Sequence, residues 1–371
     1  MDSIETRSLF PVTTHCIYLN NAAESPLNNA VWAKLEEYIE SASCTPHKKQ
    51  SPREQLRTQL ATILGGLADD YALIPSTAMG IGTVAAGFPW RAGDNVVLPG
   101  GEHWSNTFPW LLLQERGVQL RIVQPGKDHR IDPGEIQKAV DNKTRILACA
   151  AVRFNSGFRA NLRALSAIAH ANGALFLVDA IQAAGACPIN VVDDGIDIMA
   201  GAGFKWLLGM HGTGYLYLNE RARSMVQAVL PGMFAAEDNL DELRWLAGSR
   251  KYESGTLPYA LFHAWTAGLE VVQSIGVDSI YKRNLELSAR IIDGLTASGL
   301  SVLSPHNKES ERSAIVVADS GDAQRNKAIH QTLLDEAIIT TFRAGVLRIS
   351  PNFYNTESEI DQFLNAVRAA V

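Results

Sequence analysis

The stretch ALFLVDAIQAAGACPINVVDDGIDIMAGAGFK, residues 174–205, contains two short apolar runs, and an ionisable residue stands at the end of each. The run LFLVD ends at Asp179, and Lys205 follows the run IDIMAGAG (196–203). Runs of this length between turn residues are typical of buried strands in a parallel sheet. In such sheets ligands bind beyond the carboxyl ends of the strands, so Asp179 and Lys205 are candidate site residues.

Further apolar runs precede this stretch, and segments with helical periodicity, such as NLRALSAIAHANG (161–173), separate the runs. This alternation predicts βαβ units and a mainly parallel sheet. The earlier runs are NVVLPG (95–100), VQLRIVQ (118–124) and RILACAAV (145–152).

The sequence pattern changes after about residue 250, where longer helical segments precede the run SAIVVAD. We therefore expect an α/β protein with a second, smaller domain. The expected parts are an N-terminal arm at 1–15, which packs with the small domain, a large domain at 16–250 and a small C-terminal α/β domain at 251–371.

Composition limits the classes of function. With 371 residues and 46% hydrophobic content, the chain can bury a large core. Its net charge of -6 comes from interspersed acids and bases, which gives no footprint for nucleic acid or an anionic membrane. The start lacks a basic and then apolar leader, and the four cysteines show no CxxC spacing. We expect a soluble cytoplasmic enzyme that acts on small molecules, with no metal site and no membrane partner.

A third feature, PSTAMGIGT (75–83), predicts a turn that leads into a helix whose free amides could hold a phosphate. Each feature alone has an ordinary structural explanation: Asp179 as a turn residue, Lys205 reaching solvent, and Ser76 as a helix cap. Together they supply what pyridoxal phosphate requires, namely a Schiff-base lysine, a carboxylate for the ring nitrogen and a phosphate site.

Seven ordered blocks resemble the class V aminotransferase and cysteine desulfurase-like superfamily of fold type I pyridoxal phosphate enzymes. The resemblance covers nearly the whole chain and implies a large domain with a mainly parallel sheet of the seven-stranded type. The blocks are YLNNAAESPL (18–27), PSTAMGI (75–81), EHWSNTFPW (102–110), VDAIQAAGACPINV (178–191), GFKWLLGMHGTGYLY (203–217), YESGT (252–256) and LRISPNFYNTESEID (347–361).

The resemblance assigns the catalytic roles. Lys205 matches the lysine that carries the cofactor, and Asp179 matches the carboxylate that pairs with the pyridine nitrogen. His103 matches the residue that stacks on the ring face, and Gln182 matches the residue that bonds the phenolic oxygen.

For the cofactor phosphate, the resemblance implies Ser76, Thr77 and the amide of Ala78. Gly255 and Thr256 would reach the phosphate from the neighbouring subunit, which implies a homodimer with shared active sites.

The substrate side of the site is implied in the same way. Arg348 matches the arginine that holds a substrate α-carboxylate, a task suited to a bidentate guanidinium. Asn21, Ala22 and Asn155 are further expected substrate contacts. The usual family asparagine aligns with Phe154, so Asn155 would have to replace it.

Two departures from the family pattern bear on the reaction. Many relatives read Ser-x-His-Lys around the Schiff-base lysine, whereas this chain reads Ala202-Gly203-Phe204-Lys205. Two usual side-chain contacts to the phosphate are therefore absent, and backbone amides must contribute more. Cysteine desulfurases carry a loop with a nucleophilic cysteine between the segment matching RAG and the arginine matching Arg348, whereas here only Val346 and Leu347 intervene. Cys187 could lie near the site, but a small core residue is the simpler reading.

These features favour a carbon–sulfur lyase that acts on a cysteine-derived conjugate through an external aldimine. The alternative is a class V aminotransferase or an amino-acid epimerase. A remote alternative is a non-catalytic sensor with the same fold, although the chain has no basic patch or added domain for DNA.

Overall fold

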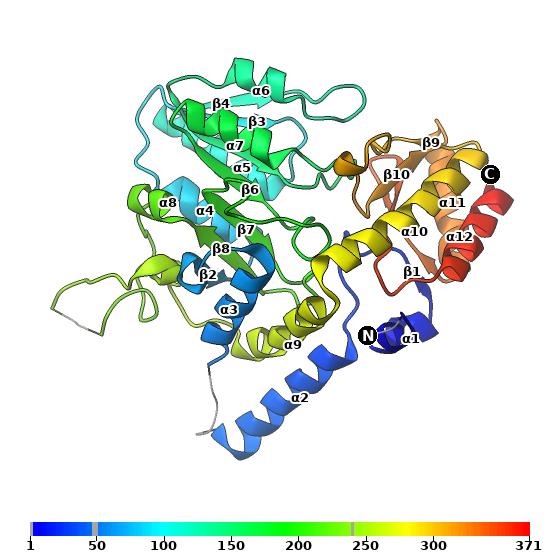
Figure 1. Cartoon of the computed structure of the whole chain (residues 1–371), viewed down its shortest axis with the longest axis horizontal. Helices are drawn as coiled ribbons and strands as arrows, with labels where there is room; N and C mark the ends of the chain where they lie inside the picture. The colour runs from blue at the N-terminus through cyan, green and yellow to red at the C-terminus, as the bar shows by residue number, and fades with distance from the viewer. Residues whose placement is uncertain (1–2, 47–50, 239–240) are drawn as a thin grey trace.

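The computed structural model describes residues 3–46, 51–238 and 241–371. A seven-stranded sheet forms the centre of the larger part of the molecule (Figure 1). Its strand order is β2-β8-β7-β6-β5-β3-β4, and only β8 runs antiparallel to its neighbours. The expected mainly parallel sheet is therefore confirmed. The strands are β2 (Tyr71–Ile74), β3 (Asn95–Pro99), β4 (Gln119–Val123), β5 (Thr144–Ala150), β6 (Leu175–Asp179), β7 (Ile198–Ala202) and β8 (Gly214–Leu218).

Both faces of this sheet are covered, which explains the continuous apolar runs. In β6, Phe176 and Val178 join one core cluster, whereas Leu175 and Leu177 join the cluster on the opposite face. Helices α3 (Arg53–Leu64), α6 (Pro133–Ala139) and α7 (Leu162–Ala171) contribute to the first core, and α4 (Thr77–Gly87) and α5 (Phe108–Leu112) contribute to the second.

The C-terminal part has its own sheet and its own core (Figure 1). Four antiparallel strands pair in the order β12-β13-β10-β9. The elements are α10 (Val277–Ala297), β9 (Ser301–Val302), β10 (Val316–Asp319), α11 (Ala323–Asp335), β12 (Thr341–Arg343), β13 (Val346–Ile349) and α12 (Glu357–Ala370).

The N-terminal segment contacts this smaller part. Strand β1 (Ile17–Tyr18) pairs in parallel with β11 (Ile338–Ile339), and Arg7 of α1 (Ser3–Ser8) is ion-paired with Glu359 at 2.8 Å. These contacts support the proposed packing of the arm, of which residues 1 and 2 lie outside the described residues.

The division of the chain at residue 250 stays a proposal. Trp265 in α9 (Tyr259–Ile275) is buried in the core cluster of the large sheet, and α9 packs against α2 (Asn29–Cys44). The other helices are α8 (Glu220–Met225) and the short 3-10 segments Pro11–Thr14, Ala68–Asp70, Trp104–Asn106, Leu113–Arg116, Gly248–Tyr252 and Glu309–Glu311. In the part of the chain that the structure describes, no helix is both long and apolar enough to cross a membrane.

Candidate active site

A cavity of about 470 Å³ lies at the carboxyl ends of the central strands, where residues of the C-terminal part also reach it. It brings most of the expected site residues together from separate segments of the chain. Its lining is Ala22, Ala23, Ser76, Thr77, Ala78, His103, Ser105, Ala150, Val152, Phe154, Asp179, Ile181, Gln182, Phe204, Lys205, Thr341, Arg343 and Arg348.

Asp179 is the last residue of β6, in the middle of the sheet, and is 2% exposed. Its Oδ1 accepts a hydrogen bond from the Ile181 amide at 3.0 Å. Among the described residues, no hydrogen-bond partner is found for Oδ2. Burial raises the pKa of Asp179 to about 6, while the Ile181 amide and Lys205 oppose that rise. A cationic ring nitrogen at Oδ2 would keep this carboxylate ionised.

Lys205 follows β7 in a tight turn, where the Gly209 amide donates to the Gly203 carbonyl at 2.8 Å. A Cβ at Gly203 would lie 2.4 Å from Thr213 Oγ1, so the turn requires glycine there. Burial lowers the pKa of Lys205 to about 8, and Arg348 lowers it further, whereas Asp179 raises it. A far larger fraction of this amine is therefore neutral near physiological pH than for an ordinary lysine, and covalent chemistry with a carbonyl requires the neutral form.

The N-terminus of α4 offers an anion site. Ser76 caps the helix, since its Oγ accepts from the Met79 amide at 3.2 Å. Thr77 Oγ1 is buried and has no hydrogen-bond partner among the described residues. A phosphate at this helix end would accept from Thr77 and from first-turn amides, including that of Ala78. The unpaired hydroxyl therefore fits the phosphate of pyridoxal phosphate.

His103 and Gln182 are held by their neighbours. His103 Nδ1 accepts from the Ser105 amide at 3.2 Å, and the ring packs edge-on against Phe154 with centroids 5.2 Å apart. Burial lowers the pKa of His103, and two nearby cations lower it further, which favours a neutral ring suited to stacking. Gln182 donates to the Ala22 carbonyl at 2.9 Å and accepts from Trp206 Nε1 at 2.9 Å, so its second amide hydrogen is left for a ligand.

Arg348 of β13 is 6% exposed, and no carboxylate pairs with it among the described residues. Its Nη1 donates to the Phe154 carbonyl at 3.3 Å, its Nη2 donates to Thr341 Oγ1 at 3.4 Å, and its Nε has no partner there. Burial, together with Arg343, lowers the pKa of Arg348 to about 10, which still leaves the group cationic at neutral pH. A buried guanidinium without a counter-ion is suited to bind a carboxylate.

Four expected site residues do not line this cavity, and their roles stay predictions. Asn21 accepts from the Tyr354 hydroxyl at 3.0 Å and donates to the Ser350 carbonyl at 3.3 Å. Asn155 donates to the Gly101 carbonyl at 3.2 Å. Gly255 and Thr256 are exposed in the single chain. Residues that contribute to the active site of a neighbouring subunit are expected to be exposed in this way.

Thr341 and Arg343 line the cavity although the sequence analysis gave them no role. They lie two residues apart on β12, so their side chains share one face, and Thr341 pairs with Arg348 across the hairpin. The alternation of Thr341, Phe342 and Arg343, which leads into the RAG segment, was the signal that could have identified them.

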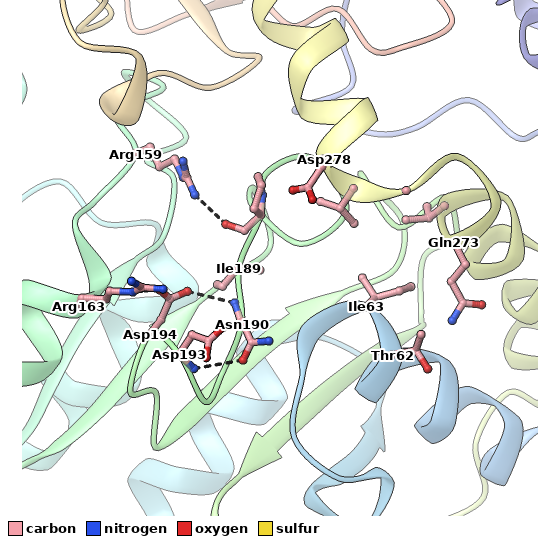
Figure 2. A pocket seen from close by; sticks show the side chains of 14 residues that line it. Thr62, Ile63, Arg159, Arg163, Ile189, Asn190, Asp193, Asp194, Gln273 and Asp278 are labelled. Carbon is pink, nitrogen blue, oxygen red and sulfur yellow. Dashed lines mark hydrogen bonds and ion pairs between the residues drawn. The ribbon is translucent and has the colours of Figure 1, made fainter. Parts of the chain in front are cut away.

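A second cavity, of about 490 Å³, lies near Ile189, between α3 and the start of α10 (Figure 2). Both of its arginines have polar partners in the protein. Arg163 pairs with Asp194 at 3.2 Å, and Arg159 donates to the Pro188 carbonyl at 2.8 Å (Figure 2). In the cavity around Lys205, by contrast, Arg348 has no ion pair among the described residues.

Comparisons with known proteins agree with the fold. A family model for class V aminotransferases matches residues 17–363. A probable cysteine desulfurase of Methanothermobacter thermautotrophicus is 28% identical, and the match covers 97% of this chain and 96% of the relative. An uncharacterised aminotransferase of Bacillus subtilis is 23% identical, with 98% of this chain and 96% of the relative covered.

Solved structures share the fold. A cysteine desulfurase from Thermococcus onnurineus superimposes with a TM-score of 0.90 at 23% identity, with 99% of this chain and 97% of that chain covered. A cystine C–S lyase in complex with its product, cysteine persulfide, has a TM-score of 0.90 at 20% identity, with 97% and 99% covered. The chain belongs to the class V aminotransferase family, and it is a pyridoxal-phosphate-dependent enzyme.

Proposed function

We propose that the enzyme is a carbon–sulfur lyase that acts in the cytoplasm, as a homodimer, on a cysteine-derived S-conjugate. The observation that carries this proposal is the hairpin between β12 and β13. Only Ala344 and Gly345 connect the two strands, with φ values of 51° and 85°. Positive φ at both positions is typical of the tight turns that join twisted strands, and such a turn has no room for a catalytic loop.

The positions of the cysteines support the same proposal. Cys149 and Cys187 are fully buried in the core beside the large sheet, and burial raises the pKa of Cys187 to about 12. None of Cys16, Cys44, Cys149 and Cys187 is among the residues that line the cavity. Without a thiolate at the site, sulfur has to leave the substrate by elimination rather than by transfer to the protein.

The names of the relatives favour a sulfur-containing substrate. One curated relative is named a probable cysteine desulfurase, and one structural neighbour is named a cystine C–S lyase. Both names concern carbon–sulfur bond cleavage in an α-amino acid. The short hairpin supports the lyase proposal, because the resemblance to cysteine desulfurases implies a longer loop there.

The side chains divide the work of such an elimination. Arg348 holds the α-carboxylate and so fixes the direction of the Cα–H bond. The neutral amine of Lys205 accepts the Cα proton, and the Cβ–S bond breaks to release a thiolate, which takes up a proton. When bound, the cofactor supplies an electron sink for charge at Cα, and Asp179 keeps its ring nitrogen protonated. Addition of water to the remaining three-carbon fragment gives pyruvate and ammonia.

The main alternatives are transamination and epimerisation, which share the removal of the Cα proton. Incubation of the holoenzyme with amino acids and cysteine S-conjugates separates them. We expect equal amounts of pyruvate and thiol from an S-conjugate. Formation of a keto acid that retains the side chain, or exchange of the Cα proton for deuterium without bond cleavage, would overturn the proposal. A non-catalytic sensor would give spectral changes without any product.

A further inference from the structure

The cavity around Lys205 contains more positive than negative charge. Of the described residues that line it, Lys205, Arg343 and Arg348 are basic, and Asp179 is the one acid. A bound cofactor engages Lys205 and Asp179, and its phosphate fits the N-terminus of α4. The α-carboxylate of an amino acid neutralises Arg348. Arg343 is then left without a counter-ion.

Arg343 is held in place although it has no ion pair among the described residues. Its guanidinium carbon lies 4.8 Å from the centroid of the Phe154 ring and 5.3 Å from that of the Trp104 ring. Such cation–π contacts orient a guanidinium while they leave its N–H groups free to donate. The group is therefore positioned for an anion that the described residues do not supply.

The hairpin fixes Arg343 relative to Arg348. Thr341 pairs with Arg348 and Arg343 pairs with Val346, so the two arginines are diagonal neighbours on one face of the β12–β13 ladder. The Cα atoms of diagonal neighbours of this kind lie about 7–8 Å apart. The two-residue turn at Ala344 and Gly345 prevents the strands from separating at this end. One small molecule with two acidic groups can therefore reach both guanidinium groups.

We propose that Arg343 binds an acidic group at the far end of the substrate side chain. The substrates are then α-amino acids whose side chains end in a carboxylate or a similar anion. This inference rests on the proposed function, because it names the substrate class of the same site. For a cysteine S-conjugate, the released thiol would carry the acidic group.

The test compares acid and amide pairs of nearly equal shape. In the holoenzyme, dissociation constants are measured by calorimetry for L-glutamate against L-glutamine and for L-aspartate against L-asparagine. Turnover is measured for S-carboxymethyl-L-cysteine against S-carbamoylmethyl-L-cysteine. We expect the acid to be favoured at least about tenfold in at least one binding pair and in kcat/KM, as for a charged hydrogen bond.

The variants assign this preference to one side chain. Arg343→Gln should bring the ratio of acid to amide close to one while the amides still bind, and Arg343→Lys should restore part of the preference. Arg368→Gln, which removes an exposed arginine of α12 that donates to Asn365, is the matched control and should leave the ratio unchanged. Circular dichroism confirms that each variant folds.

Equal binding of acid and amide by the wild type, or an unchanged ratio in Arg343→Gln, would overturn the inference. A neutral conjugate that is cleaved while the acids are not favoured leaves the proposed function in place. Preferential binding of the acids without any elimination supports the role of Arg343 and overturns the lyase proposal instead.

Discussion

Lys205 should react with pyridoxal phosphate at a much lower pH than an ordinary lysine does. Burial lowers the pKa of this amine to about 8, helped by Arg348 and Arg343 and opposed by Asp179. Only the neutral amine attacks a carbonyl. At pH 7 a pKa near 8 leaves about 9% of the amine neutral, whereas the ordinary value near 10.4 leaves roughly 0.04%, a ratio of about 200.

The assay mixes apoenzyme rapidly with pyridoxal phosphate between pH 6 and pH 11 and follows the absorbance of the lysine-bound cofactor. Because the folded-state pKa is depressed, the rate should rise with pH through about 8 and level off above it. The same pH series with Nα-acetyl-lysine, whose ε-amine is free, shows how titration of the cofactor itself affects the rate. Lys205→Ala should not develop the absorbance of the lysine-bound cofactor. A midpoint that coincides with that of Nα-acetyl-lysine would refute the reasoning.

Three further predictions concern the other groups of the site. Asp179→Asn should fold and retain cofactor but lose turnover by about 100-fold or more, because an amide cannot support a protonated ring nitrogen; wild-type turnover in this variant would contradict the assignment. Arg348→Lys should raise KM by roughly 5- to 150-fold, since the loss of bidentate geometry costs about 1–3 kcal/mol. If the wild type bound an amino acid and its decarboxylated amine equally, this role of Arg348 would be wrong. A variant with all four cysteines changed to Ala or Ser should keep its activity on an S-conjugate, whereas a persulfide trapped by alkylation on the wild-type protein would restore the desulfurase reading.

The sequence predicts the parallel part of the large sheet well, because its strands are buried on both faces and read as continuous apolar runs. The run LFLVD coincides with β6. The sequence analysis did not assign β2, with residues YALI, and β8 runs antiparallel to both of its neighbours. Strand direction depends on the connections between strands, which short apolar runs do not encode.

The same distinction applies to the site. Lys205 and Asp179 follow from their positions after buried strands, because parallel strands present their carboxyl ends at one edge. Arg343 lies in the C-terminal part of the chain, and its place in the cavity depends on how the β12–β13 hairpin packs against Phe154. Asn155 was expected at the site because it follows Phe154, which aligns with the family asparagine. Its side chain instead donates a hydrogen bond to the Gly101 carbonyl. Both residues lie in a turn, where Phe154 lines the cavity and Asn155 does not, so sequence proximity alone does not decide which one reaches a ligand.

The most direct test of the lyase proposal is the identity of the three-carbon product. The wild-type holoenzyme is incubated with S-carboxymethyl-L-cysteine and S-carbamoylmethyl-L-cysteine, each labelled with ¹³C in its cysteine carbons, and the products are followed by NMR. Elimination predicts labelled pyruvate in an amount equal to the released thiol. Labelled alanine would indicate that sulfur is transferred rather than eliminated, and a labelled keto acid that still carries sulfur would indicate transamination. Either of these products in place of pyruvate would contradict the account.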